Sequence, residues 1–588
     1  MDSHSMHTHT CGELRREDIG REVALTGWVW HRRDHGGLIF VDLRDRAGVT
    51  QVSFDPEHSG GIAFHTAETI RSEWPIKVVG TVRKRPEGQA NEKLATGQIE
   101  VLVSEIEVLN TARTPAFQIE DHVDAAEDVR LRYRYLDIRR PKMMANLRLR
   151  SDFTFAIRQA LHDRAFMEVE TPALFKSTPE GARDFLVPSR TQPGHFYALP
   201  QSPQLLKQLL MVGGVERYYQ VAKCFRDEDL RADRQPEFTQ VDVEMSFVEQ
   251  DDVMAALEDV LAEAFSKVGV QMQLPLRRLP YWEAMDTYGT DKPDTRFGME
   301  LHDVTQIFSA SKFKLFSSAA ADPKTYVKAI NAKGAGKWPR AQIDKLADVA
   351  SAFGARGLAY IAFREDGSVT SPIVKFFSDE EMAALRAEMD VEPGDLVMFA
   401  VESRLAADEI LGGMRSHMAD ALGLVREGHD FLWVVDFPLF HWDEDRGAYA
   451  AEHQPFTQPM EADVELLDAD PLSVGSHTYD FVMDGFEAGG GMRIHDAGLQ
   501  MRILEKLGFT EERAREQFGF LMEALKFGAP PMGGFALGLD RVCMLLAGSD
   551  SIREVMAFPK TSSGSDLMSD APGEVSGRQL KEVSLRLL

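Results

Sequence analysis

The stretch Phe225–Phe238 reads FRDEDLRADRQPEF, and it decides how the rest of the chain is interpreted. It is dense in arginines and carboxylates and has an aromatic residue at each end. Apolar runs flank it, YYQVAKC before and TQVDVEMSF after, and they predict two strands joined by a charged loop. Arginines bind phosphate oxygens in pairs, and carboxylates bind Mg²⁺. The stretch therefore predicts a platform for a polyanion and a metal ion. The alternative is a solvated hairpin tip whose charges neutralise one another.

A second stretch far downstream, Gly533–Arg541, reads GGFALGLDR and precedes the apolar run VCMLLAG. Glycines beside a strand allow a planar ligand to approach the backbone closely. Leu539, Val542 and Leu545 have helical spacing, which predicts Arg541 on the first turn of a buried helix. A lone arginine in such a place is usually an ion-pair partner, so its meaning depends on the first stretch.

Together the two stretches resemble the second and third motifs of the class II aminoacyl-tRNA synthetases. The first motif is matched by a predicted helix from about Asn146 to His162 and the strand-like run FMEVETP, which ends at Pro172. Two longer runs, TPEGARDF from Thr178 and ALPQSPQLLKQLL from Ala198, narrow the resemblance to the bacterial aspartyl-tRNA synthetases. The resemblance covers the chain from end to end, and it implies a homodimer built through the first motif.

The resemblance implies an α+β fold with several domains, as expected for a chain of 588 residues. Its parts are an antiparallel-sheet catalytic core, an N-terminal OB-fold β-barrel and an inserted α/β domain of the GAD type. The expected boundaries are 1–114 for the barrel, 115–145 for a hinge, 146–290 and 424–560 for the catalytic core, 291–423 for the insertion and 561–588 for a C-terminal extension.

Composition limits the setting of the protein. Cys11, Cys224 and Cys543 are too widely separated for a zinc-finger spacing, and they fit a reducing cytoplasm. No apolar run is long enough to span a membrane, so no membrane partner is expected. The formal net charge of −27 argues against non-specific binding of nucleic acid, because proteins that bind it mainly through charge are basic. A tRNA reader with this charge must take its specificity from splayed bases and shape.

The N-terminal 114 residues contain five short apolar-alternating runs, which predict the barrel. OB-folds stack unpaired bases on aromatic side chains. The predicted anticodon contacts are Trp28, Arg32, Arg33, His35, Phe40 and Gln51. The alternative for Trp28 and Phe40 is that both rings only fill the barrel.

His35 bears on the range of tRNA substrates. In the resembled family, enzymes strict for tRNA(Asp) typically carry leucine at this place, and a histidine accompanies enzymes that also charge tRNA(Asn). Those relaxed enzymes supply an amidotransferase with its substrate, on the route to Asn-tRNA(Asn). An imidazole can donate to or accept from either third anticodon base, whereas leucine can do neither. Both specificities stay open at this point.

Activation of aspartate by ATP needs no general base, because the attacking carboxylate is already an anion. It needs positioning and neutralisation of phosphate charge. The resemblance assigns the catalytic roles to Arg226 at the α-phosphate, Arg541 at the γ-phosphate and Glu228 at the adenine edge. The expected ATP-binding residues are these three with Gln235, Phe238, Glu487 and Gly538. Asp480 and Glu487 are the expected Mg²⁺ ligands. The alternatives are a turn-forming role for Asp480 and a core position for Phe238.

Selection of aspartate requires cations for its side-chain carboxylate, and Lys207 and Arg493 are expected to supply them. A neutral asparagine amide would leave that charge unpaired. Asp242 and Gln204 are expected to hold the ammonium group, and Ser202 and Gln240 to complete the floor of the pocket. His453 is expected to contact the ammonium group or ATP, and Glu180 to lie on a closing lid.

Two positions depart from the family pattern. Gln454 follows His453 where relatives have a second histidine, and GGGMRIH is one residue shorter than expected, with Met492 in the place of a serine. Three other functions remain as alternatives: a synthetase-like protein without tRNA charging, an RNA-binding protein built on the barrel, and an asparaginyl or lysyl relative. Arg226, Arg541 and the complete barrel disfavour the first, and the long catalytic motifs disfavour the second. The third shares the barrel and the class motifs, and ATP–pyrophosphate exchange with each free amino acid distinguishes it.

Overall fold

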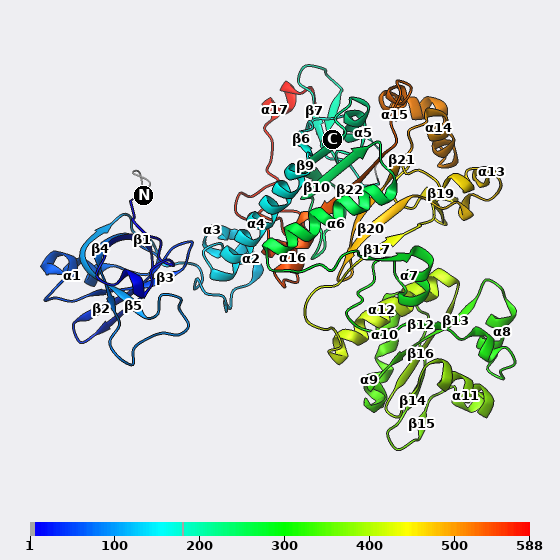
Figure 1. Cartoon of the computed structure of the whole chain (residues 1–588), viewed down its shortest axis with the longest axis horizontal. Helices are drawn as coiled ribbons and strands as arrows, with labels where there is room; N and C mark the ends of the chain where they lie inside the picture. The colour runs from blue at the N-terminus through cyan, green and yellow to red at the C-terminus, as the bar shows by residue number, and fades with distance from the viewer. Residues whose placement is uncertain (1–5, 179–180, 588) are drawn as a thin grey trace. The chain divides into compact units, whose positions relative to one another are not determined.

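The computed structural model describes residues 6–178 and 181–587. The chain divides into two compact units (Figure 1). The first comprises Met1–Ser151, Leu230–Gln235 and Leu546–Ser576, and the second comprises Asp152–Asp229, Pro236–Leu545 and Gly577–Leu588. Each unit is described by itself.

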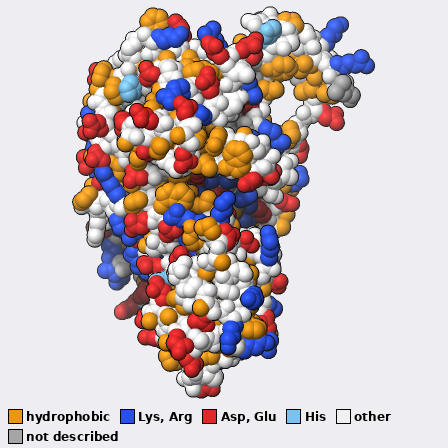
Figure 2. All heavy atoms as spheres, turned by 90° about the vertical axis from the view of Figure 1, so that its right-hand side faces the viewer, with side chains coloured by type: hydrophobic (Ala, Val, Ile, Leu, Met, Phe, Trp, Pro, Cys, Tyr) orange, Lys and Arg blue, Asp and Glu red, His pale blue; other side chains and the backbone are white. Residues whose placement is uncertain are grey.

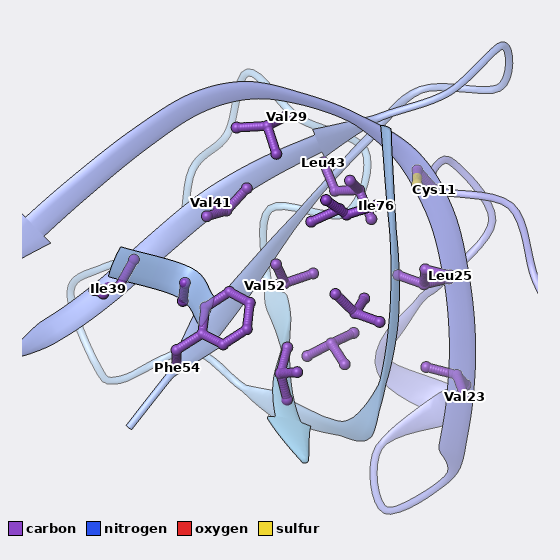
Figure 3. Packing of buried hydrophobic residues seen from close by; sticks show 14 of the residues in the cluster. Cys11, Val23, Leu25, Val29, Ile39, Val41, Leu43, Val52, Phe54 and Ile76 are labelled. Atoms are coloured by element: carbon purple, nitrogen blue, oxygen red, sulfur yellow. The ribbon is translucent and has the colours of Figure 1, made fainter. Parts of the chain in front are cut away.

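The first unit contains a closed five-stranded barrel with the strand order β1-β2-β3-β5-β4. Its elements are β1 (Glu22–His35), β2 (Leu38–Arg44), β3 (Val49–Phe54), β4 (Pro75–Lys84), β5 (Ile99–Val108) and helix α1 (Gly60–Thr69). Alternate residues of each strand point inward, so that Val23, Leu25, Val41 and Leu43 meet in one buried core (Figure 3). The predicted OB-fold barrel is confirmed, and neither Trp28 nor Phe40 belongs to its buried core.

The rest of the first unit lies around two short helices, α2 (Glu127–Arg132) and α3 (Arg134–Asp137). The buried Arg134 donates to the carbonyl oxygens of Arg553, Met556 and Ala557 and to the carboxylate of Asp137. Its guanidinium thereby joins residues far apart in the sequence. Helix α4 (Pro141–Asp163) follows, and it contains the helix predicted from Asn146 to His162.

The second unit is built on an eight-stranded sheet in the order β11-β17-β20-β21-β22-β10-β9-β6. The strands are β6 (Met167–Glu168), β9 (Arg217–Phe225), β10 (Glu237–Ser246), β11 (Arg277–Pro280), β17 (Phe431–Val435), β20 (Thr478–Met483), β21 (Phe486–Arg493) and β22 (Met532–Gly538). All neighbours are antiparallel except the edge pairs β11–β17 and β6–β9. The predicted antiparallel catalytic core is confirmed.

Helices lie on both sides of this sheet (Figure 1). Those of the catalytic part are α5 (Gln204–Val212), α6 (Gln250–Lys267), α7 (Tyr281–Tyr288), α13 (Leu466–Ala469), α14 (Ala497–Lys506), α15 (Glu511–Leu525) and α16 (Leu539–Leu546). The smaller elements are the strand pairs β7 (Leu186–Pro188) with β8 (Phe196–Ala198) and β18 (Phe440–Asp443) with β19 (Ala448–Ala451), and the terminal helix α17 (Gly577–Glu582).

The run FMEVETP forms a shorter strand than predicted. Only Met167–Glu168 pairs as a strand, although the Val169 N–H still donates to the carbonyl of Tyr219. The Thr171 N–H donates instead to the side chain of Gln220, and Pro172 has no N–H to donate. A side chain and a proline therefore end the strand that the apolar pattern extends.

Between β12 and α12 the chain forms a separate five-stranded antiparallel sheet in the order β12-β13-β16-β14-β15. Its elements are β12 (Leu301–Asp303), β13 (Tyr326–Ala332), β14 (Ala359–Phe363), β15 (Val369–Thr370), β16 (Leu396–Glu402) and helices α8 (Lys314–Ala321), α9 (Arg340–Asp344), α10 (Leu346–Ala352), α11 (Asp379–Glu388) and α12 (Arg404–Leu422). Ile330 and Met398 pack in a core with α10 and α12, whereas Ala329 and Phe399 pack on the other face with α8 and α11. The sheet is thus covered by helices on both faces, as expected for the inserted α/β domain.

Acidic and basic side chains are interspersed on the face of the molecule that Figure 2 displays. Over the described residues, no helix has both the length and the apolar character needed to cross a membrane.

Candidate active site

One face of the eight-stranded sheet carries most of the residues singled out in the sequence. Strand β10 alternates, so that Phe238, Gln240, Asp242 and Glu244 share a face, while Val241 and Val243 are buried on the other. Cross-strand pairing places Asp242 beside Ala536 of β22, and Ala536 beside Gly489 of β21. Gly489 in turn pairs with Asp480 of β20, so that one row across the sheet joins the two aspartates.

The strands between these two aspartates carry small residues on this face. Gly534 shows why: a Cβ there would lie 1.7 Å from Oε2 of Glu244 and 2.4 Å from the carbonyl oxygen of Val243. A Cβ on Gly489 would lie 3.3 Å from Oδ1 of Asp480. The small residues therefore create a hollow with polar side chains around it.

This hollow is a pocket of about 180 Å³. All the described residues predicted to bind aspartate line it, together with Arg226: Ser202, Gln204, Lys207, Gln240, Asp242, His453 and Arg493. Helix α5 contributes Gln204 and Lys207 through two successive turns of the helix. Glu180 lies outside the described residues.

Two cations and two carboxylates form a buried cluster in the pocket. Lys207 Nζ lies 2.7 Å from Asp242 Oδ1 and 3.1 Å from Glu244 Oε2. The Arg493 guanidinium donates to both oxygens of Glu244, at 2.9 and 3.2 Å. The cluster of Lys207, Asp242, Glu244 and Arg493 is balanced in charge, which is what allows it to be buried.

Although the charges of the cluster balance, some polar atoms of the pocket residues have no hydrogen-bond partner. Among the described residues, the buried atoms Asp242 Oδ2, Gln204 Nε2 and Arg493 Nη1 have no hydrogen-bond partner. Buried polar groups are normally paired, so these three atoms mark a place for a polar ligand with both donors and acceptors. Burial raises the pKa of Asp242 to about 6, although Lys207 acts in the opposite direction.

A second group of residues continues along the same face toward the loop between β9 and β10. The Arg226 guanidinium lies over the Phe238 ring, 5.0 Å from its centroid. Arg541, on the first turn of α16 as predicted, approaches Glu487 Oε1 at 3.8 Å. Lys292 Nζ approaches the other oxygen of Glu487 at 3.1 Å. The site thus holds one arginine over a half-buried aromatic ring and a second arginine beside a carboxylate, and these are groups that suit a nucleotide.

Asp480 is buried and faces His453. The Nε2 atom of His453 lies 3.0 and 3.1 Å from the two carboxylate oxygens of Asp480. Burial raises the pKa of Asp480. Burial alone would lower the pKa of His453, but the neighbouring Asp480 outweighs it, so the pKa of the imidazole is raised as well.

The carboxylates suit a metal ion only in part. Asp480 and Glu487 share a face of neighbouring strands, but Asp480 is already paired with His453. Among the described residues, no group of three or more histidine, cysteine or carboxylate side chains could by itself hold a metal ion. Mg²⁺ commonly takes one or two protein carboxylates and completes its shell with phosphates and water. The two residues fit a magnesium ion that arrives with a nucleotide.

Gln235, an expected ATP-binding residue, is held by the main chain of a distant segment. It is buried, and both ends of its side-chain amide pair with the main chain of Lys560, at 3.0 and 2.7 Å. An ATP contact of Gln235 stays a prediction, and with its side-chain amide so paired it would involve other atoms of the residue. Glu228 is half-buried in the loop, and Gly538 ends β22 with open space in front of its Cα, since a Cβ there would meet nothing closer than Arg541 Cδ at 4.0 Å.

Strand β1 of the barrel carries a bulge that decides which residues face outward. The register shifts between Val29 and His31, and beyond it His31, Arg33 and His35 share the outer face with Phe40 of β2. Arg32 points the other way and donates to the carbonyl oxygen of Ala67. Arg32 and Arg33 therefore lie on opposite faces of β1, and the anticodon contact predicted for Arg32 stays a prediction.

The outer face of the barrel is polar and internally paired. Arg33 donates to both oxygens of Asp42, at 2.7 and 2.8 Å, and Gln51 donates to Glu100 at 2.7 Å. His35 is exposed, with its ring centroid 5.9 Å from that of the half-buried Phe40.

Trp28 lies on the outer face but away from His35 and Phe40. The Arg139 guanidinium covers its ring at 4.4 Å, and Arg139 also pairs with Glu73 at 2.9 Å. Glu73 forms a buried pair with Arg44 at 2.7 Å. Trp28 therefore packs against the hinge segment, and of the two predicted stacking residues only Phe40 lies beside His35.

Sequence reasoning missed Glu244, the carboxylate that both cations of the pocket share. The signal was present, because Asp242 and Glu244 are two apart in the run VDVEMS and must share a face of a strand. It also missed Asp42 and Glu100, which hold Arg33 and Gln51. Acidic residues on a surface expected to bind RNA gave no sequence signal.

The shortened run GGGMRIH causes no break in the structure. Strand β21 pairs without interruption from Gly489 opposite Ala536 to Arg493 opposite Met532. Met492 lies on the other face, where it would contact a Cβ on Gly533. Gln454 lines the pocket beside His453.

Comparison with known proteins shows the family of the chain. The family described as tRNA synthetases class II (D, K and N) matches residues 126–562, and the OB-fold nucleic acid binding domain matches residues 23–109. The chain is 51% identical over 583 residues to the aspartate–tRNA(Asp/Asn) ligase of Desulfatibacillum aliphaticivorans, covering 99% of this chain and 97% of that protein. It is 51% identical over 582 residues to the protein of the same name from Syntrophotalea carbinolica, covering 98% and 97%.

Among solved structures, the fold resembles that of the asparaginyl-tRNA synthetase of Pyrococcus horikoshii complexed with asparaginyl-adenylate. The TM-score is 0.58 at 19% identity, covering 94% of this chain and 98% of that one. The aspartyl-tRNA synthetase of Entamoeba histolytica gives the same TM-score and identity, covering 93% and 90%. At these identities the likeness concerns the fold.

Proposed function

Because the chain belongs to the class II tRNA synthetases of the D, K and N group, we propose that it is an aspartate–tRNA ligase. It activates L-aspartate with ATP to aspartyl-adenylate and transfers the aspartyl group to the 3′ end of tRNA(Asp). The observation that carries the proposal is the buried pocket in which Lys207 and Arg493 lie beside Asp242. Both a carboxylate oxygen, Asp242 Oδ2, and a guanidinium nitrogen, Arg493 Nη1, lack a hydrogen-bond partner there. An aspartate zwitterion offers the matching groups.

In this proposal the ammonium group of the substrate binds Asp242 Oδ2, and its side-chain carboxylate binds Arg493 Nη1; both atoms are among the buried atoms of the pocket that lack partners. Asparagine would place a neutral amide against the guanidinium of Arg493. The lost charge pairing in a dry site is expected to cost several kcal/mol, on the order of a hundredfold or more in kcat/KM. The selectivity for aspartate also depends on Glu244, because its ion pairs hold Lys207 and Arg493 in position.

The α-carboxylate of aspartate then attacks the α-phosphorus of ATP, and pyrophosphate leaves. Arg226 lies in the same pocket and over the Phe238 ring, so it can neutralise the α-phosphate while the adenine lies against Phe238. Arg541 is the partner of the γ-phosphate. A bound Mg²⁺, held by Glu487 and Asp480 together with the phosphates, would neutralise charge on the triphosphate. No side-chain base is required in this step.

A second substrate, tRNA(Asn), is favoured by two observations. His35 is exposed at the end of β1 beside Phe40, and both relatives described above are named for tRNA(Asp/Asn). An imidazole at this place can pair with either third anticodon base. The product Asp-tRNA(Asn) would have to be consumed by an amidotransferase, which we propose as a partner.

The quaternary structure we propose is a homodimer. The helix and strand of the first motif expose the large apolar side chains Phe155 and Met167, and Phe247 follows β10 with most of its surface exposed. Exposed apolar groups of this size are typical of interfaces. We propose the cytoplasm as the location, because a chain of this length with only three widely separated cysteines fits a reducing compartment. Sedimentation at micromolar concentration tests the dimer, and a monomer would contradict it.

The test of the function is charging of purified tRNA(Asp) and tRNA(Asn) transcripts with aspartate, asparagine and lysine at physiological salt. Aspartate charging of both transcripts is expected. Charging of tRNA(Asp) alone would remove the second substrate, and activation of asparagine or lysine in place of aspartate would contradict the proposal as a whole.

The role of His35 is tested by His35→Leu, with His65→Leu on the exposed side of α1 as the matched control. The first variant is expected to lose charging of tRNA(Asn) and to keep that of tRNA(Asp). The control is expected to keep both. Equal loss of both tRNAs by His35→Leu would contradict a role in discrimination.

A further inference from the structure

Gln240 lies between two groups of the proposed active site. Strand β10 presents Phe238, Gln240 and Asp242 on one face, with successive side chains about 7 Å apart. The proposed function puts the adenine against Phe238 and the ammonium group of aspartate at Asp242. The α-carboxylate is bonded to the same carbon atom as the ammonium group and must reach the α-phosphate, so its place is beside Gln240. Gln240 lines the pocket and is half-buried, as this place requires.

The neighbouring strand β9 supplies a hydrogen-bond donor to the side chain of Gln240. Cys224 pairs with Phe238 across the two strands, so it shares their face and lies diagonally opposite Gln240. The Cys224 thiol donates to Gln240 Oε1, with Sγ and Oε1 3.3 Å apart. Cys224 is fully buried, so it can act on a bound substrate only through a neighbouring side chain.

The direction of this hydrogen bond matters because the two ends of an amide differ. The oxygen of a glutamine amide accepts hydrogen bonds, and its NH₂ group donates them. An amide whose oxygen faces a thiol donor presents its NH₂ group on the other side. A reversed amide would present its oxygen to the substrate carboxylate, and two acceptors would then face each other without a proton between them.

We propose that Cys224 is a positioning residue for activation of aspartate: it holds the amide of Gln240 with the NH₂ group toward the α-carboxylate of the substrate. The proposal rests on the proposed function, since it needs aspartate to bind between Asp242 and the nucleotide. Cys224 takes no part in bond making and keeps its proton throughout.

The test is ATP–pyrophosphate exchange by the full chain, with the KM for aspartate and the KM for ATP measured separately. Cys224→Ala is expected to raise the KM for aspartate about fivefold, the range of one neutral hydrogen bond, and to leave the KM for ATP unchanged. Cys224→Val, which fills the space of the thiol without a donor, is expected to give the same rise. Cys224→Ser restores a donor and is expected to keep the KM for aspartate within about twofold of the unchanged protein.

Two further variants show whether Cys224 acts through Gln240. Gln240→Met raises the KM for aspartate by itself, and adding Cys224→Ala to it is expected to cause no further rise, because the amide is already gone. The matched control is Cys11→Ala, which removes another fully buried thiol, one that donates to the carbonyl oxygen of Thr26 at 3.6 Å in the barrel. This control is expected to leave both KM values unchanged.

An unchanged KM for aspartate in both Cys224→Ala and Cys224→Val would overturn the inference. The same result follows if Cys224→Ala raises this KM as much in the Gln240→Met protein as in the unchanged one, since the thiol would then act by another route. Equal rises in the KM for aspartate and the KM for ATP would show a general disturbance of the sheet and would also overturn it. Failure of the unchanged protein to exchange pyrophosphate with aspartate would instead overturn the proposed function.

Discussion

Replacement of Glu244 by glutamine is the sharpest test of how the pocket is held together. Glu244 is fully buried and is the shared partner of Arg493, at 2.9 and 3.2 Å, and of Lys207, at 3.1 Å. Glu244→Gln leaves Asp242 as the one carboxylate of the cluster against two cations. Breaking a buried ion pair by removing one partner costs about 3–5 kcal/mol. The glutamine oxygen can still accept one hydrogen bond, worth about 1 kcal/mol, so we expect a net loss of roughly 2–4 kcal/mol.

The assay is urea unfolding of the full chain followed by circular dichroism, with Glu258→Gln as the matched control. Glu258 is also a buried glutamate, but its Oε1 accepts only from neutral donors, Trp433 Nε1 at 2.9 Å and the Leu276 N–H at 3.3 Å. A glutamine oxygen can keep both bonds, so we expect a loss under about 1 kcal/mol. Because a chain with two compact units need not unfold in one step, the transition midpoints of the two variants are compared with each other.

The reasoning would be refuted by equal midpoints for the two variants. It would also be refuted if Glu244→Gln unfolded at the same urea concentration as the unchanged protein, since Lys207 and Arg493 would then not depend on the carboxylate.

Three further predictions follow from the geometry. Burial raises the pKa of Asp242 to about 6, and only its ionised form can hold an ammonium group. The KM for aspartate should therefore rise about tenfold per pH unit as the pH falls below 6. A flat pH profile of pyrophosphate exchange between pH 5 and 8 would contradict this. Gly534→Ala puts a Cβ 1.7 Å from Glu244 Oε2 and should lower the free energy of unfolding in urea by about 3 kcal/mol or more. Gly538→Ala, whose Cβ would have no atom nearer than 4.0 Å, should lower it by less than about 1 kcal/mol. Equal losses of stability in the two variants would count against the close approach at Gly534. Glu73→Gln removes the shared partner of Arg44 and Arg139 and should destabilise the first unit by about 3 kcal/mol. Glu68→Gln, at an exposed position, should change the stability by less than about 0.5 kcal/mol. Equal urea-unfolding midpoints of the two variants would refute the role of the buried pair.

The residues that line the pocket were expected from the family resemblance, and the alternation of β10 explains why those on that strand share a face. What the alternation could not supply is the partner across the sheet. Glu244 is conspicuous only when Arg493, 249 positions later in the chain, is placed beside it by the pairing of β10, β22 and β21.

The barrel shows where a pattern fails. Strand alternation puts Arg32 on the face opposite to Arg33 and His35, and a bulge in β1 decides that Arg32 is the one that turns inward; no periodicity in the run WVWHRRDH marks the extra residue. Likewise, a glutamine in a charged loop gives no sign that the side-chain amide of Gln235 pairs with the main chain of Lys560.

The sequence by itself determined the family, through its motifs, and the order of the barrel and the antiparallel core, through the alternation of its strands; the residues of the aspartate pocket stay a prediction that the resemblance implies. The tertiary structure alone decided which charges neutralise one another: Glu244 with Lys207 and Arg493, Asp480 with His453, and Lys292 with Glu487. The physical reason is that an ion pair depends on a distance of a few ångströms between side chains, and that distance is set by strand register and by the junction of segments remote in the chain.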